Sequence, residues 1–169
     1  MLDIQENGRL TLVFIASASV LILGTALVAQ YGFGLMPCEL CFAQRPPYAL
    51  TFVLAALAMM PAVDSEQRRI VVLLCAAIFA VDAGIAGYHA GVEWKWWQGP
   101  TACTSSGGTI DFSDLAAALQ KPAFVACDQP AVRVLGLSMA GYNFIAATVL
   151  TISAAWAGTR FPWWTKQRG

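Results

Sequence analysis

The sequence predicts an all-α integral membrane protein, a four-helix bundle with a long outer loop that carries a short interfacial helix. Composition is the first reason: of 169 residues, 58% are hydrophobic and only 12% are charged, and the mean hydropathy is +0.62. A chain this apolar is typical of membrane helices and not of a soluble globular domain. The second reason is that the apolar residues gather in four segments, and the length suggests one membrane domain over residues 1–169.

Four transmembrane helices are expected at about residues 10–29, 46–63, 70–90 and 134–157. The first and last segments contain no charged residue, and the third contains a single acid, Asp82. About twenty residues at about 1.5 Å per residue cover a hydrocarbon core of roughly 30 Å. The apolar run of the first segment is too long for a cleaved signal peptide, so we expect it to remain as a span.

The distribution of cations predicts the orientation in the membrane. Six of the ten cations fall on one side: Arg9, Arg68, Arg69, Arg160, Lys166 and Arg168. By the positive-inside rule both termini are cytoplasmic, and the loops 30–45 and 91–133 face outward. Aromatic residues fit the same two interfaces, with Trp94, Trp96 and Trp97 outside and Phe161, Trp163 and Trp164 inside. The net charge is zero and there is no basic block, so nucleic acid is not an expected partner.

Four of the five cysteines fall in the two outward loops. Cys38 and Cys41 form a Cys-x-x-Cys pair at the edge of the membrane, and Cys103 and Cys127 lie in the longest polar stretch. Between the latter two, residues 111–120 are predicted to form the interfacial helix. A dithiol beside the membrane and a second pair in a loop favour an electron relay as the first hypothesis. Cys75 lies mid-membrane and is most simply an inert packing residue.

The residues after Cys41 support redox chemistry at this pair. Pro46 and Pro47 fix the start of the second helix, since proline is tolerated only in the first turn. Cys41 therefore lies just ahead of a helix N-terminus. We expect the helix dipole and Arg45 to stabilise its thiolate and to lower its pKa.

The residues alone leave two other roles for the cysteines open. The four loop cysteines could supply the four ligands of a zinc site, although the second pair is not closely spaced. Each loop could instead hold a structural disulfide, but the ring closed by Cys38 and Cys41 is so short that the entropic stabilisation is small.

The stretch Pro37-Cys-Glu-Leu-Cys-Phe-Ala-Gln-Arg45, together with the second cysteine pair, resembles the disulfide bond formation protein B (DsbB) family, which are bacterial inner-membrane thiol:quinone oxidoreductases. His89 and the Gly136-Leu137 stretch also sit where the family pattern has them. The resemblance covers almost the whole chain.

This resemblance implies a two-stage relay. The Cys103–Cys127 disulfide would oxidise a soluble periplasmic DsbA-type protein of thioredoxin fold, and the electrons would pass to Cys38–Cys41 and then from Cys41 to a bound quinone. Arg45 and His89 are the residues expected to bind the quinone, with ubiquinone first and menaquinone as the alternative; no metal is implied. Vitamin K epoxide reductase-like enzymes and a non-catalytic membrane protein with structural disulfides are the competing interpretations. In the former the quinone-facing pair comes after the loop cysteines, whereas here it comes first.

Four other positions in or directly after the third segment have a structural interpretation. Asp82 is an ionisable group inside a membrane helix, and we expect a hydrogen bond to a neighbouring helix, with Asn143 or Gln30 as partner, rather than a proton path. Gly84, Gly87 and Gly91 are expected at close helix packing, and Gly87 and Gly91 have the spacing of two small residues four apart.

Overall fold

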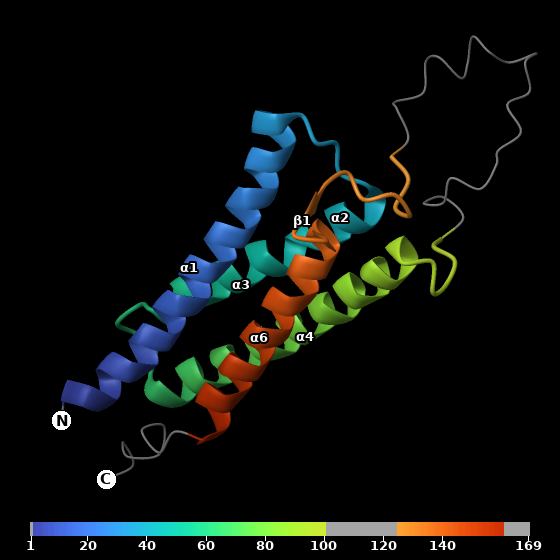
Figure 1. Cartoon of the computed structure of the whole chain (residues 1–169). Helices are drawn as coiled ribbons and strands as arrows, with labels where there is room; N and C mark the ends of the chain where they lie inside the picture. Colours follow the sequence, from blue (N-terminus) through green and yellow to red (C-terminus); the bar gives the residue numbers. More distant parts are fainter. Residues whose placement is uncertain (1, 101–124, 161–169) are drawn as a thin grey trace, which may run out of the picture.

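A computed structural model of the chain describes residues 2–100 and 125–160 (Figure 1). Its elements are α1 (Leu2–Phe33), α2 (Glu39–Ala43), α3 (Arg45–Ala58), α4 (Ser65–Glu93), β1 (Arg133–Val134), β2 (Leu137–Ser138) and α6 (Met139–Arg160). The described part is mainly helical, as predicted. Cys103, the helix expected at 111–120, and Phe161, Trp163 and Trp164 lie outside the described residues.

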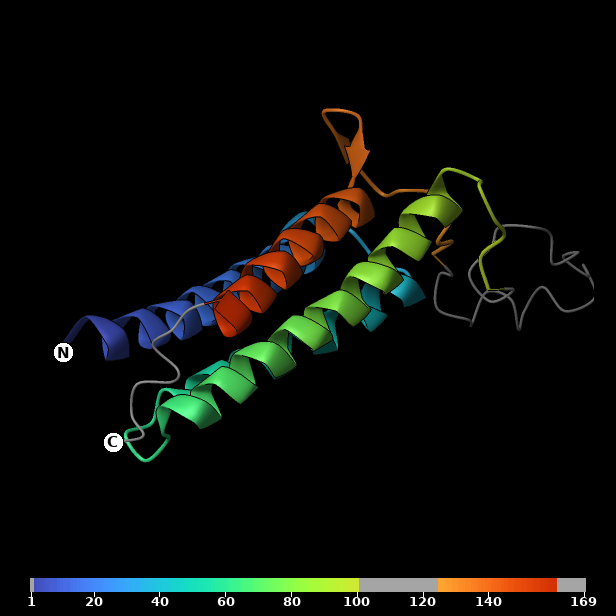
Figure 2. The same ribbon diagram turned by 90° about the horizontal axis from the view of Figure 1, so that it is seen from below.

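The helices pack in two pairs that are joined at the centre. α4 packs along α6 and α1 along α3, and contacts between α3 and α4 join the pairs (Figures 1 and 2). The core that these helices share has Ile15 of α1, Tyr48 of α3, Phe79 of α4 and Leu150 of α6 as members. Close helix packing is confirmed at Gly87, because a Cβ there would lie 3.1 Å from the Phe144 ring of α6. The prediction is wrong at Gly84, where nothing lies within 4 Å of an added Cβ, and at Gly91 the near atoms are those of Trp97, just after α4, and not of another helix.

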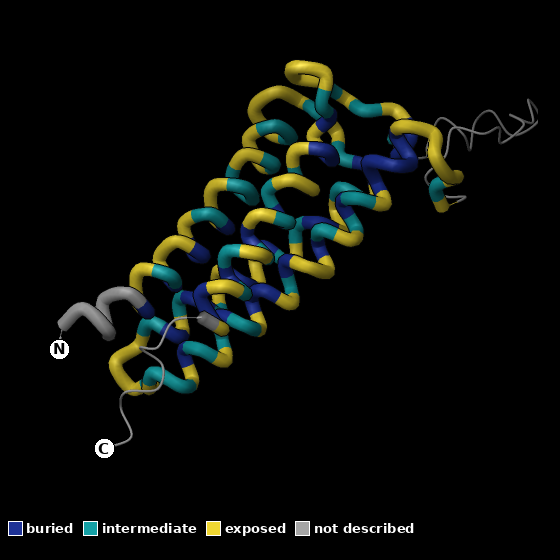
Figure 3. The backbone as a smooth tube through the Cα atoms, turned by 60° about the horizontal axis from the view of Figure 1, so that its bottom comes forward, coloured by how far each residue is buried: buried dark blue, intermediate teal, exposed yellow. Residues whose placement is uncertain are grey.

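Three of the described helices are long and apolar enough to cross a membrane: Gly8–Phe33, Ser65–Glu93 and Met139–Thr159. Large apolar side chains stay exposed along them, and exposed residues follow the outside of the helices from end to end (Figure 3). A surface of this kind suits lipid and not water, so the chain is a membrane protein.

Helix α3 is shorter than the predicted second span. It ends at Ala58, whereas the apolar segment continues to Val63. Pro61 lacks an N–H group and disfavours helical geometry in the residue before it, so the chain turns at Met59 and Met60 instead. With 14 residues, α3 is about 21 Å long.

Helix α6 begins at Met139 rather than at Val134 because a tight hairpin precedes it. Leu135 and Gly136 have φ angles of 50° and 85°, and Val134 pairs with Leu137 across this two-residue turn. Positive φ at both central positions is the geometry of a two-residue hairpin loop. Ser138 then caps the helix, since its hydroxyl accepts a hydrogen bond from the Gly141 N–H at 3.1 Å.

Candidate functional site

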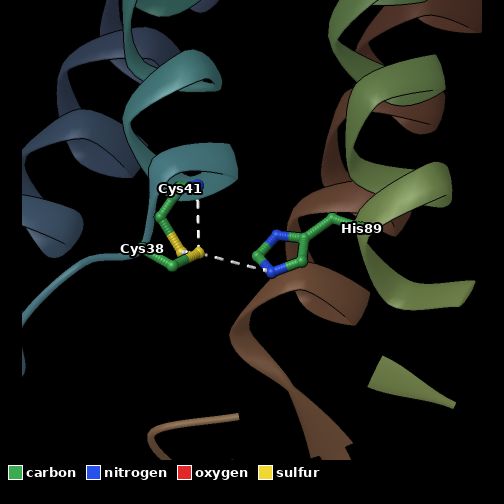
Figure 4. Close-up of side chains that lie close together, drawn as sticks. All are labelled: Cys38, Cys41 and His89. Carbon is green, nitrogen blue, oxygen red and sulfur yellow. Dashed lines mark hydrogen bonds between the residues drawn. The ribbon is translucent and has the colours of Figure 1, made fainter. Parts of the chain in front are cut away.

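The Cys-x-x-Cys pair is held by the short helix α2. Cys38 is its N-cap residue, and its sulfur accepts a hydrogen bond from the Cys41 backbone N–H at 3.4 Å. The cap directs both side chains to the same side, so the two sulfurs lie 3.0 Å apart, with the Cys38 thiol donating to Cys41 (Figure 4). This is the geometry of a reduced pair in which one sulfur is poised as thiolate and the other as thiol.

The two cysteines have opposite acidities. The hydrogen bond from the Cys38 thiol, assisted by a hydrogen bond with the Cys38 backbone, lowers the pKa of Cys41 despite its burial. The same thiol–thiolate bond, together with burial, raises the pKa of Cys38 to about 12. Cys41 is therefore the nucleophile and the better leaving group of the pair.

The cause of the Cys41 shift differs from the one expected from the sequence. We expected Arg45 and a helix dipole to stabilise the Cys41 thiolate, whereas the neighbouring thiol of Cys38 has the largest effect. Arg45 engages other groups: its Nη1 donates to Gln30 Oε1 at 2.7 Å, and its guanidinium lies 4.7 Å from the centre of the Phe42 ring. These contacts keep the guanidinium beside α1.

His89 comes from the other side of the site, on α4. Its ring points at the sulfurs, with Nε2 3.5 Å from Cys38 Sγ (Figure 4). Nδ1 lies 3.0 Å from Gln44 Nε2, and Nε2 lies 3.7 Å from Glu93 Oε1. Since only 2% of the histidine is exposed, water is excluded from these contacts and they act at low dielectric.

Cys127 lies in the same small buried cluster as Cys38, with Val125 packed against them. This confirms that Cys127 is held close to Cys38. Lys95, just after α4, forms an ion pair with Asp128 at 2.5 Å and so ties the segment that carries Cys127 to the end of α4. The structure thus brings together Cys38, Cys41, His89 and Cys127.

A cavity of about 510 Å³ opens beside the pair. Its polar rim includes Cys41, Arg45 and His89, and its apolar wall includes Ile22 and Ala26 of α1. A mostly apolar cavity of this size with a few converging polar groups suits a small planar ligand.

The predicted partner of Asp82 is confirmed. Asn143 of α6 donates from Nδ2 to Asp82 Oδ2 at 3.2 Å, and the same nitrogen donates to Gln44 Oε1 at 2.7 Å. Asp82 Oδ1 is buried without a hydrogen-bond partner among the described residues. The carboxyl is therefore part of a polar network that reaches the site.

The ligand atoms of Cys38, Cys41 and His89 lie within 4.8 Å of one another, which is a donor set that a soft metal ion could use. Using it would require the Cys38–Cys41 hydrogen bond to break and His89 Nε2 to present a lone pair.

Sequence reasoning missed Gln44 and Glu93. Glu93 could have been found, because it lies one turn after His89 on the same helix face and the spacing predicts contact. Nothing in the sequence singles out Gln44, whose importance comes from partners on other helices.

A pair of cysteines with opposite acidities, packed against a third cysteine and beside an apolar cavity, is the site of a thiol–disulfide oxidoreductase in a membrane protein. The family model for the disulfide bond formation protein DsbB matches residues 8–157, which is most of the chain. The chain therefore belongs to the DsbB family of disulfide-forming membrane proteins, and not with the vitamin K epoxide reductase-like enzymes.

The chain is similar to two relatives, of which the first carries the family's name. A disulfide bond formation protein B of Herminiimonas arsenicoxydans is 35% identical over 86 residues, which are 50% of this chain and 52% of that protein. An uncharacterized protein of Rickettsia prowazekii (strain Madrid E) is 27% identical over 151 residues, which are 88% of this chain and 86% of that protein. No solved structure matches the chain.

Proposed function

We propose that the protein is a thiol:quinone oxidoreductase that reoxidises a periplasmic DsbA-type dithiol protein. The observation that carries this proposal is the position of the Cys38–Cys41 pair, which packs against Cys127 and also lines an apolar cavity. Electrons from a soluble donor would reach Cys38 through Cys127, and the cavity beside both sulfurs would admit a lipid-dissolved acceptor.

Electrons would enter the inner pair by two thiol–disulfide exchanges. After the donor has reduced the outer pair, the Cys127 thiolate attacks Cys38 in the Cys38–Cys41 disulfide, and Cys41 leaves with the bonding electrons. The Cys103 thiolate then attacks Cys127, which re-forms the outer disulfide and releases Cys38 as a thiolate that takes up a proton. The lowered pKa of Cys41 supports the first exchange, because a thiol of low pKa leaves faster.

Electrons would leave the inner pair through Cys41. When the Cys38–Cys41 disulfide re-forms, the pair gives up two electrons and the proton of Cys38. A quinone that accepts two electrons and two protons, one of them from solvent, supplies the oxidising power that a donor near −120 mV requires. Ubiquinone is the first candidate and menaquinone the second.

The cavity fits a quinone head group. Its volume of about 510 Å³ lies within the range of small-ligand sites, and its wall on α1 is apolar. Arg45 lines it and could donate to a quinone carbonyl oxygen by exchanging its Gln30 contact. His89, which also lines the cavity, is held against Cys38, so we assign it to the sulfurs as well as to the quinone.

We further propose that α1, α3, α4 and α6 cross the bacterial inner membrane as a four-helix bundle. Both termini would be cytoplasmic, and the loops 30–45 and 91–133 would face the periplasm, as the cations predict. α2, the hairpin and the end of α4 lie together at the end of the molecule assigned to the periplasmic side (Figure 1).

The test is quinone reduction by the purified protein. Supplied with a reduced DsbA-type donor and ubiquinone-1 or a short-chain menaquinone, the protein should oxidise the donor and consume the quinone in a one-to-one ratio. Donor oxidation that proceeds equally well without quinone under anaerobic conditions would contradict the proposal.

A further inference from the structure

We propose that Gln44 holds the neutral ring of His89 in the form that carries its hydrogen on Nε2, so that His89 donates a hydrogen bond to Cys38 and does not accept its proton. This makes Gln44 a positioning residue. The inference deepens the proposed function, because it assigns the chemistry of one side chain in that relay.

The orientation of the Gln44 amide follows from a backbone group. The Leu40 carbonyl oxygen can only accept, and it lies 3.1 Å from the amide nitrogen of Gln44. One hydrogen of that NH₂ group is therefore used on Leu40, and the second is directed at His89 Nδ1, 3.0 Å away. A side-chain NH₂ has no lone pair to offer, so Nδ1 must be the acceptor.

A second contact fixes the same orientation independently. Gln44 Oε1 accepts from Asn143 Nδ2 at 2.7 Å, and Asn143 is itself oriented because its Oδ1 accepts from the Tyr48 hydroxyl at 2.5 Å. Asn143 Nδ2 donates in addition to Asp82. Turning the Gln44 amide over would place donor against donor at Asn143 and acceptor against acceptor at Leu40.

The hydrogen on His89 follows from this. With Nδ1 as acceptor, the hydrogen of the neutral ring is on Nε2, which faces Cys38 Sγ at 3.5 Å and Glu93 Oε1 at 3.7 Å. Nε2 has no lone pair left for the Cys38 proton, and Nδ1 is occupied by Gln44. The same hydrogen also prevents Nε2 from acting as a metal ligand in this arrangement, which argues against a zinc site at these three residues.

In the proposed relay this donor acts on a leaving group. When the Cys103 thiolate attacks Cys127 in the Cys127–Cys38 mixed disulfide, the S–S bond breaks and Cys38 departs with the electron pair. The His89 N–H points at the sulfur on which that charge develops. A preorganised donor of this kind stabilises the transition state without rearrangement.

The experiment exploits the fact that the chain has one histidine. The protein is labelled with ¹⁵N-histidine, freed of any histidine tag, and placed in nanodiscs in its reduced form. Imidazole ¹H–¹⁵N correlation spectra are recorded at a pH of about 8.5, where free imidazole is neutral. We expect signals of a single form of the His89 ring, with its hydrogen on Nε2 and with Nδ1 as a hydrogen-bond acceptor.

Two variants change the partner of Nδ1. In Gln44→Glu the new carboxylate accepts, so hydrogen should appear on Nδ1. In Gln44→Met, which keeps the side-chain length without a donor, the two nitrogen shifts should move toward each other as both tautomers become populated. Gln67→Ala, which removes a glutamine of the α4 capping box, is the control and should leave the His89 spectrum unchanged.

The inference would be overturned if the His89 ring of the wild-type protein carried its hydrogen on Nδ1. It would also be overturned if the His89 ring in Gln44→Glu kept its hydrogen on Nε2 alone. These spectra do not depend on turnover, so they distinguish its failure from failure of the proposed relay. As a kinetic check, release of Cys38 from a trapped mixed disulfide should slow about tenfold in Gln44→Met, as expected for losing one hydrogen bond to a developing charge.

Discussion

Cys127 is packed against Cys38 in a buried cluster, although the two cysteines come from segments on opposite sides of α3 and α4 in the chain. A sulfur of the outer loop is therefore already within the inner site when the helices are assembled. No large movement of the segment 125–128 is needed to bring Cys127 to Cys38, because the Lys95–Asp128 ion pair and the packing of Val125 hold it there.

The first prediction concerns alkylation of the reduced inner pair. Because the pKa of Cys41 is lowered by the Cys38 thiol, its thiolate persists to a lower pH than that of an ordinary cysteine, whereas the raised pKa of Cys38 keeps it protonated to a pH of about 12. Iodoacetamide at pH 7 should modify Cys41 first, as read by peptide mass spectrometry. The substitution Cys38→Ala removes the thiol that donates to Cys41, so iodoacetamide should modify Cys41 only at a higher pH. Preferential labelling of Cys38 at pH 7 would contradict the assignment.

The second prediction is that Cys41→Ser lowers quinone reduction by at least about a hundredfold, because it removes the only route from the pair to the acceptor. The outer pair should still form one mixed disulfide with the donor. Cys75→Ser is the matched control, since Cys75 is buried in the helix core away from the site, and it should keep its turnover. Undiminished turnover in Cys41→Ser would contradict the relay.

The third prediction is that Arg45→Ala raises the apparent KM for quinone about tenfold, as expected for losing about 1.4 kcal/mol of binding. The KM for the protein donor should change much less, because Arg45 lines the cavity and not the Cys127 side. Arg69→Ala is the control, since Arg69 bonds the Gly158 carbonyl at the far end of α4. Equal effects on both substrates would make Arg45 a structural residue.

The fourth prediction concerns which outer cysteine the donor attacks. Cys127 is 1% exposed, so a soluble protein has no access to its sulfur. A donor that lacks its own resolving cysteine should therefore be trapped on Cys103 in a Cys127→Ser background, and non-reducing gels would show the adduct. Trapping only on Cys127, in the reciprocal Cys103→Ser variant, would reverse the assignment.

The fifth prediction tests helix packing. Gly87→Leu should lower the free energy of unfolding by about 1–3 kcal/mol, because a Cβ there meets the Phe144 ring at 3.1 Å and the helices α4 and α6 must separate. Gly84→Leu is the matched control on the same helix, since nothing lies within 4 Å of its added Cβ. Unfolding in SDS–detergent mixtures measures both, and an equal loss in the two variants would argue against close packing at Gly87.

The sequence predicted most of the helical fold because apolar runs and their boundaries are local signals. The start of α4 was placed too late, at residue 70, because the helix begins at Ser65 after a capping box of Asp64 and Gln67, in a polar stretch that the apolar pattern does not include. The end of α3 was missed because the apolar run continues past Pro61, and composition alone does not show that the helix ends before this proline. The start of α6 was missed because positive φ at Leu135, a residue that rarely adopts it, cannot be read from an apolar pattern.

The site was predictable to the extent that its residues carry their own chemistry. The cysteines and Arg45 were identified from type and spacing, and His89 from the resemblance to the family. The sequence did not show which neighbouring side chain controls the acidity or the orientation of each group. Cys38, rather than Arg45, has the largest effect on the pKa of Cys41, and Gln44 orients the ring of His89. The contact of Gln44 with His89 joins different helices and exists only once they pack, and the contact of Cys38 with Cys41 depends on the short helix α2, which was not predicted.

The short length of α3 determines where the redox pair lies. At about 21 Å, α3 is roughly half as long as the 29-residue α4, so α2 meets the last turns of α4 from the side rather than above its end. Cys38 is therefore surrounded by helices and only 5% exposed, so it is out of contact with bulk water. Small soluble thiols such as glutathione have no direct approach to Cys38, so of the two sulfurs only that of the partly exposed Cys41 can react with molecules from the surrounding solution.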